Sequence, residues 1–212
     1  MHIAIFGATG ATGLLLTERA LAAGHTVSAL VRTPANFPYA DRVRVTQGDA
    51  FNPEAIAQTL VGADAVLSAL GARSLKREDV LERAIPLIVR AMDDAHISRI
   101  IALGSAGALD SALDKQPAWK RWLVQNILYN TFLKWPVISQ RAQIATLAAS
   151  DLNWTMPMPP RLTNTPARGN LRIDPDALPN GAARISRADV ADFMMAQLTS
   201  EQYARRGVYI AS

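Results

Sequence analysis

The chain has 212 residues, of which half are apolar, and its 22 basic and 18 acidic side chains give a formal net charge of +4. This length and composition fit one soluble α/β domain with a full hydrophobic core. The absence of cysteine excludes disulfides, thiolate zinc sites, iron–sulfur ligation and a thiol nucleophile. The three histidines are scattered, so the sequence also predicts no metal site.

The charge and hydropathy patterns limit the partners of the chain. The basic excess is dispersed rather than clustered, so we expect no nucleic-acid partner. No apolar run approaches the length of a membrane span, and the first residues run directly into an apolar strand instead of a signal peptide. We therefore expect a cytoplasmic protein that does not bind a membrane.

The first half of the chain alternates strands with helices. Short apolar runs predict strands at 2–6, 26–31, 42–46, 64–70 and 98–103. Helical spacing predicts helices at 11–23, 53–60 and 79–95, the last with Pro86 as a candidate kink. This order implies right-handed crossovers and a Rossmann-type, doubly wound, mostly parallel sheet in a single domain covering 1–212.

The second half is less regular. We expect a loop over 105–118, an aromatic-rich segment over 119–135, and mostly loop over 160–183. Apolar patterns predict a helix at 137–149 and strands at 153–156 and 207–211, and Ser186 and Asp189 mark the start of a final helix. Residues 105–135 and 158–185 are expected to form a small C-terminal substrate lobe.

A glycine-rich turn joins the first strand to the first helix. Such a turn lets a pyrophosphate approach the backbone, where N–H groups and the helix dipole hold it. Its last glycine allows the helix to pack closely on the strand. The residues assigned to this phosphate cradle are Gly7, Thr9, Gly10, Ala11, Thr12 and Gly13.

The end of the second strand selects the cofactor. An acidic residue there would bind the ribose 2′-hydroxyl of NAD, but this chain has Arg32 followed by Thr33, which suit the 2′-phosphate of NADP(H). An exposed Arg at a strand end is the alternative interpretation. Further contacts to the adenosine half are assigned to Asp49, Ala50, Leu70, Gly71 and Arg73.

Seven sequence blocks carry a family resemblance over nearly the whole chain. They are IAIFGATGATG, LVR at 30–32, GDA at 48–50, ALGAR at 69–73, GSAGAL at 104–109, SDLNWTMPMPPRLTN at 150–164 and RISRADVADFM at 184–194. The chain resembles the NAD(P)H-binding atypical short-chain dehydrogenases, and within them the biliverdin-IXβ reductase/flavin reductase group near the NmrA-like proteins. This resemblance implies an NADPH-dependent reductase on a Rossmann fold.

The resemblance also assigns residues beside the nicotinamide. It implies that Ser105 faces this ring and that Pro157, Met158 and Pro159 pass along it. Two positions depart from related patterns. Arg161 stands where the flavin reductases have a histidine, and the Tyr-x-x-x-Lys pair of typical short-chain dehydrogenases is absent. Tyr129 and Lys134 are five apart, about 140° around a helix, so we interpret them as structural.

Hydride transfer asks little chemistry of the protein beyond alignment and exclusion of water. Ser105 is expected to orient the substrate or the nicotinamide, although it can instead cap a loop. Arg161 is expected to bind an anionic acceptor group, and a surface salt bridge explains it equally well. The sequence therefore favours an NADPH-dependent oxidoreductase that reduces a small planar acceptor such as a flavin or quinone. The alternative is a non-catalytic NmrA-like sensor of NADP(H).

Overall fold

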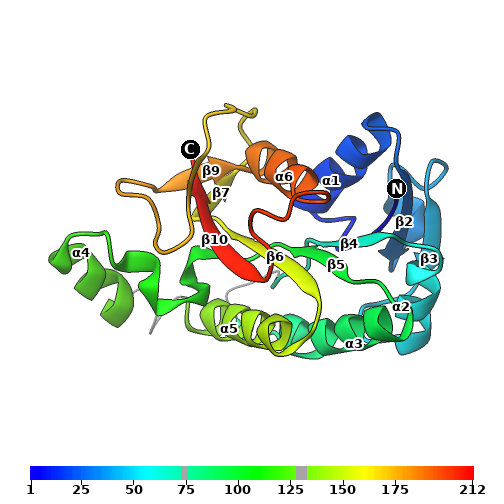
Figure 1. The fold of residues 1–212 in the computed structure, drawn as a ribbon, viewed down its shortest axis with the longest axis horizontal. Helices are drawn as coiled ribbons and strands as arrows, with labels where there is room; N and C mark the ends of the chain where they lie inside the picture. The colour runs from blue at the N-terminus through cyan, green and yellow to red at the C-terminus, as the bar shows by residue number, and fades with distance from the viewer. Residues whose placement is uncertain (73–75, 128–132) are drawn as a thin grey trace.

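An eight-stranded sheet forms the centre of the computed structural model, which describes residues 1–72, 76–127 and 133–212 (Figure 1). In spatial order its strands are β3 (Arg44–Gln47), β2 (Thr26–Val31), β1 (His2–Phe6), β4 (Ala65–Ser68), β5 (Arg99–Ala102), β6 (Asn153–Met158), β10 (Arg206–Ala211) and β8 (Arg172–Asp174). All neighbouring strands are parallel except β8 and β10. This is the predicted Rossmann-type order.

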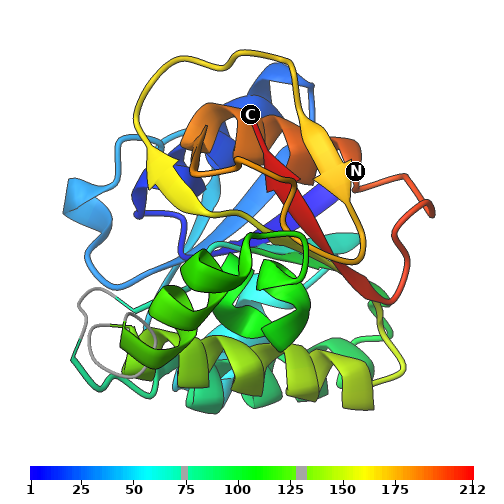
Figure 2. The same cartoon turned by 90° about the vertical axis from the view of Figure 1, so that its left-hand side faces the viewer.

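Helices cover both faces of the sheet (Figures 1 and 2). One face carries α1 (Ala11–Ala22) and α6 (Arg187–Ala196), which pack against each other. The other face carries α2 (Pro53–Leu60), α3 (Val80–Asp94) and α5 (Lys134–Ala149). The short α4 (Ala118–Leu123) lies at one end of the molecule, and 3-10 turns occupy Pro34–Asn36, Ala106–Ala108 and Asp110–Leu113.

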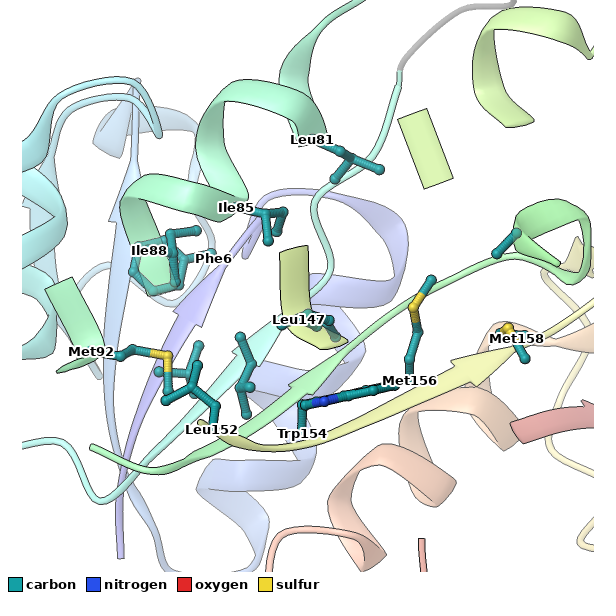
Figure 3. Close-up of a cluster of buried hydrophobic side chains, with 14 of the residues drawn as sticks. Phe6, Leu81, Ile85, Ile88, Met92, Leu147, Leu152, Trp154, Met156 and Met158 are labelled. Atoms are coloured by element: carbon teal, nitrogen blue, oxygen red, sulfur yellow. The ribbon is translucent and has the colours of Figure 1, made fainter. Parts of the chain in front are cut away.

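Successive side chains of each strand point to opposite faces of the sheet, and this divides the core into two layers. Ala4 and Phe6 of β1 point into the cluster beneath α2, α3 and α5, whereas Ile3 and Ile5 point into the cluster beneath α1 and α6. Figure 3 shows the first cluster, in which side chains of α3, α5 and β6 pack together on one face of the sheet. Because both faces are covered, the central strands β1, β2, β4, β5 and β6 are buried along nearly their whole length, as expected for a parallel sheet.

Most elements fall where the sequence predicts them. The predicted helix at 79–95 is α3, which continues through Pro86. The predicted helix at 137–149 is α5, which begins at Lys134. The region 160–183, expected to be mostly loop, contains β7 (Arg161–Thr163) and β8, while β9 (Arg184–Ser186) pairs with β7 in a small separate parallel sheet. These strands have only three residues each, too few to produce a recognisable period.

Candidate functional site

A cavity of about 720 Å³ lies at the carboxyl edge of the sheet, along the ends of β1 to β5. The strand order reverses between β1 and β4, and open α/β sheets bind ligands outside such a switch point. Its volume lies in the range of small-molecule sites. The predicted site residues that line it are Gly7, Thr9, Gly10, Ala11, Thr12, Arg32, Asp49, Ala50, Leu70, Gly71 and Ser105.

The glycine turn is forced by close backbone packing. Gly7 has φ +80°, and a Cβ there would lie 2.7 Å from the carbonyl carbon of Ala69, at the end of the neighbouring strand. A Cβ on Gly13 would lie 2.0 Å from the carbonyl oxygen of Gly7, so only glycine lets α1 start this close to β1. Gly13 does not line the cavity and instead holds the cradle in place.

The N-terminus of α1 differs from those of α2 and α6. Asn52 caps α2 and Ser186 caps α6 through side-chain hydrogen bonds, and both helices carry an acidic residue in the first turn. The N-cap of α1 is Gly10, and its first turn contains no acidic residue. Leu14 is the first residue of the helix whose amide bonds a carbonyl of the turn, that of Gly10 at 2.8 Å. The amides before it are therefore available to an anion in the cavity, which fits a dinucleotide pyrophosphate.

Arg32 and Asp49 stand at the far end of the same cavity, after β2 and β3. The exposed Arg32 has neither a hydrogen bond nor an ion pair within the described residues, so its guanidinium is free for a phosphate. Asp49 Oδ1 accepts a 2.8 Å hydrogen bond from the Phe51 amide, which fixes this carboxylate at the cavity wall. Thr33 does not line the cavity, and Arg73 lies outside the described residues.

Ser105 is positioned by the segment that the sequence assigned to the nicotinamide face. The amide of Gly104 donates to the carbonyl of Pro157 and the amide of Ala106 donates to the carbonyl of Pro159, both at 2.9 Å. The buried residues Pro157, Met158 and Pro159 do not line the cavity. In this structure they lie behind the Ser105 loop and brace it, while the Ser105 side chain makes no cap and remains at the cavity wall.

Arg161, expected to bind an anionic acceptor group, is not in the cavity wall that contains Ser105. Arg161 is the first residue of β7 and is exposed, and the next residue, Leu162, lines the cavity instead. Alternate strand residues face opposite ways, which explains why only one of the two reaches the cavity. Sequence analysis missed Arg187, the first residue of α6, which does line it and donates a 2.6 Å hydrogen bond to Asn164 Oδ1.

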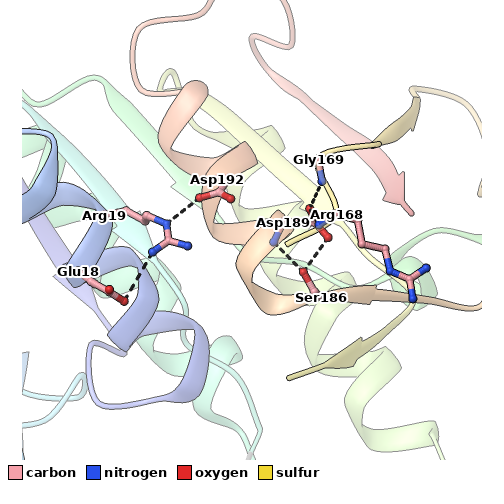
Figure 4. A network of polar contacts seen from close by, with 7 residues as sticks. All are labelled: Glu18, Arg19, Arg168, Gly169, Ser186, Asp189 and Asp192. Carbon is pink, nitrogen blue, oxygen red and sulfur yellow. Dashed lines mark hydrogen bonds and ion pairs between the residues drawn. The ribbon is translucent and has the colours of Figure 1, made fainter. Parts of the chain in front are cut away.

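A polar network fixes the start of α6 and hence Arg187 (Figure 4). Ser186 Oγ donates to Asp189 Oδ2 and accepts from the Asp189 amide, and Asp189 Oδ1 accepts from the amides of Arg168 and Gly169. Burial acts to raise the pKa of Asp189, but the Gly169 amide, the Ser186 hydroxyl and the Arg168 amide outweigh it, and the net pKa is lowered. The network therefore holds residues 164–169 against the start of α6, where Arg187 lines the cavity.

Helix α5 supplies the remaining polar wall, through Ser139 and Gln140. Tyr129 lies outside the described residues, and Lys134 is not in the wall but lies over the Trp135 ring, its Nζ 5.2 Å from the ring centroid. Within the described residues no group of three or more His, Asp or Glu side chains could hold a metal ion. No described helix is long and apolar enough to cross a membrane.

Together, the strand order, the glycine turn and the uncapped helix define a dinucleotide-binding protein with a Rossmann fold. A family model described as NAD(P)H-binding matches residues 7–201, and the chain belongs to that family. The cofactor of the site is thus NAD(P)H.

Curated proteins match this chain in sequence. The chain is 30% identical to the 3-diazoavenalumate denitrifying reductase of a Streptomyces species, covering 73% of this chain and 47% of that protein. It is 32% identical to the YwnB protein of Bacillus subtilis, covering 51% of this chain and 49% of that protein. The chain thus spans about half the length of the curated relatives it matches.

Solved structures match the whole chain. A Burkholderia pseudomallei protein provisionally described as exported has 28% identity and a TM-score of 0.81, with all of both chains covered. A Veillonella parvula short-chain dehydrogenase/reductase in complex with NADP has 22% identity and a TM-score of 0.81, covering 94% of that chain. The anaerobilin reductase ChuY of Escherichia coli O157:H7 has 22% identity and a TM-score of 0.80, covering 97% of that chain.

Proposed function

We propose that this chain is an NADPH-dependent oxidoreductase that transfers hydride to a planar acceptor such as a flavin or quinone. One observation carries the proposal: a single cavity joins the uncapped N-terminus of α1 and the free Arg32 to Ser105 and Arg187. The first two suit the phosphates of NADPH and the last two suit a reacting group and an anion. The names of relatives, a denitrifying reductase and an anaerobilin reductase, support a reductase.

The acceptor end of the cavity favours a flat, largely apolar molecule. Leu133, Pro136 and Leu162 contribute apolar wall, and Ser105 contributes a hydroxyl. Hydride transfer to a flavin or quinone needs alignment and exclusion of water rather than an elaborate set of catalytic groups. In this scheme the described parts of 105–135 together with 158–185 form the acceptor lobe, Ser105 orients the nicotinamide or the acceptor, and the chain acts as one domain.

We assign the anionic part of the acceptor to Arg187, with Arg161 as the competing candidate. Arg187 lines the cavity and Arg161 does not. A contact made equally in the ground and transition states changes KM more than kcat. Arg187→Ala should therefore raise KM for flavin mononucleotide, with little change for a neutral quinone, and Arg161→Ala serves as the matched control.

The experiment is a steady-state assay of NADPH oxidation with flavin mononucleotide and a neutral quinone, run on wild type and both variants. Selective loss on the flavin in Arg187→Ala alone supports our assignment, whereas the same loss in Arg161→Ala alone returns the role to Arg161. If the wild type binds NADPH tightly but none of the acceptors tested leads to NADPH oxidation, the reductase proposal is wrong. A sensor of NADP(H) is then the better description.

A further inference from the structure

Reduction of a quinone or flavin consumes a proton as well as a hydride, and the proposed site so far contains no proton source. Among the described residues that line the cavity, Asp49 is the only carboxylate, and it lies after β3 at the adenosine end. Within 1–72, 76–127 and 133–212, Ser105 has no side-chain hydrogen bond through which a proton could be replaced. The part of the wall formed by α5 differs from the Ser105 side, because one of its residues donates a hydroxyl hydrogen bond to a carboxylate.

That hydroxyl belongs to Ser139. Ser139 is among the residues that line the cavity, although only 3% of it is exposed. Ser139 Oγ lies 2.9 Å from Glu82 Oε1 and 2.8 Å from Glu82 Oε2, and 3.1 Å from the Glu78 carbonyl. Glu82, in the first turn of α3, is not in the cavity wall and is partly buried. Seen from the cavity, the carboxylate therefore lies behind the hydroxyl.

The surroundings of Glu82 offer it few partners. It lies in the first turn of α3, where the helix dipole favours a negative charge, and no ion pair within the described residues neutralises it. Two arginines close to this pair in sequence have other partners: Arg83 pairs with Asp79 and covers the Phe51 ring, and Arg141 pairs with Asp110. Glu82 instead accepts from the hydroxyl of a residue that lines the ligand cavity.

We propose that Ser139 and Glu82 form the proton relay of the reaction, an inference that rests on the proposed oxidoreductase function. Glu82 first takes up a proton from solvent and holds it beside the Ser139 hydroxyl. As hydride from the reduced nicotinamide supplies the electron pair, the Ser139 O–H bond breaks and an O–H bond forms on the quinone oxygen. The Glu82 proton then restores the hydroxyl, so that one hydride and one proton convert quinone to hydroquinone. Ser139 is the catalytic residue and Glu82 a positioning residue that acts through it.

The test uses two acceptors that differ in proton demand. A neutral quinone needs a hydride and a proton, whereas the N-methylphenazinium cation becomes a neutral product by taking up hydride alone. Ser139→Ala and Glu82→Gln should lower kcat/KM for the quinone on the order of 100-fold, the usual size of a general-acid contribution, and leave the phenazinium reaction nearly unchanged. Thr146→Val is the matched control, because this hydroxyl of α5 bonds the Ala142 carbonyl and does not line the cavity.

Two binding measurements accompany the kinetics. NADPH affinity, followed by fluorescence quenching, should be unchanged in both variants, which shows that the cavity is intact. Affinity of the hydroquinone for the NADP⁺ complex should fall about fivefold in Ser139→Ala, the loss of one hydrogen bond.

The possible results separate the two proposals. Selective loss of the quinone reaction with unchanged NADPH affinity supports the relay. Equal losses on both acceptors, or no loss on either, overturn the relay while leaving the reductase function standing. A wild type that reduces neither acceptor contradicts the proposed function, and the relay falls with it.

Discussion

Replacing Gly13 with alanine tests how the phosphate cradle is built. The added Cβ would lie 2.0 Å from the Gly7 carbonyl oxygen and 2.8 Å from Ala8 Cα, and both are backbone atoms that cannot rotate away. Helix α1 must then move off β1. Alanine gains about 1 kcal/mol of helix propensity over glycine, but overpacking of this kind costs about 1–3 kcal/mol and more for backbone. We expect a net loss of about 2 kcal/mol.

A loss of this size should lower the melting temperature by about 4–8 °C in a protein of this length. The assay is thermal unfolding without cofactor, and Gly10→Ala is the matched control. At Gly10 the nearest atom to an added Cβ is 3.3 Å away and φ is −76°. This variant should therefore change the unfolding free energy by less than about 1 kcal/mol, which is about 2–4 °C in melting temperature, and lose NADPH affinity instead. A Gly13→Ala protein as stable as wild type would refute the packing argument.

Three further predictions concern acid stability, turnover and metals. The folded-state pKa of Asp189 is lowered, so its ionised form adds stability above its ordinary pKa, and this is lost as pH falls through the folded value. Asp189→Asn should flatten the decline of unfolding free energy in acid, measured by denaturant titrations, and an unchanged pH slope would contradict this. Ser105→Ala should lower kcat modestly without changing NADPH affinity in quenching titrations, because the hydroxyl orients and does not bind phosphate. Activity in excess EDTA should equal activity without it; loss that a divalent ion restores would reveal an overlooked metal site.

The cofactor cradle was accessible to sequence reasoning because its constraints are local. Gly7, Gly10 and Gly13 lie within one strand–turn–helix unit, where spacing alone fixes which glycine meets backbone and which meets ligand. Arg32 follows the same logic, since the end of β2 has a fixed place in this fold. Family resemblance added Ser105, and the structure places it in the same cavity.

The acceptor side was less accessible, because it depends on register and on distant contacts. In a three-residue strand such as β7, a shift of one residue exchanges Arg161 for Leu162 at the cavity, and no period reveals which one faces it. In the sequence, Arg187 is recognisable only as part of the start of a helix. Its position at the cavity depends on the pairing of β9 with β7, which the sequence does not reveal. Ser139 and Glu82 are 57 residues apart, and only the packing of α5 on α3 brings them together.

The most direct test of the account is a comparison of NADPH and NADH affinities in wild type and Arg32→Ala, by fluorescence titration at fixed ionic strength. Arg32 lines the end of the cavity that we assign to the adenosine half, and it has no partner of its own within the described residues. Wild type should bind NADPH about tenfold more tightly than NADH, a preference tempered by solvent because the side chain is exposed. Arg32→Ala should bring the two affinities together by weakening NADPH alone. Equal affinities in wild type, or an unchanged ratio in the variant, would contradict the assignment of this cavity to NADPH.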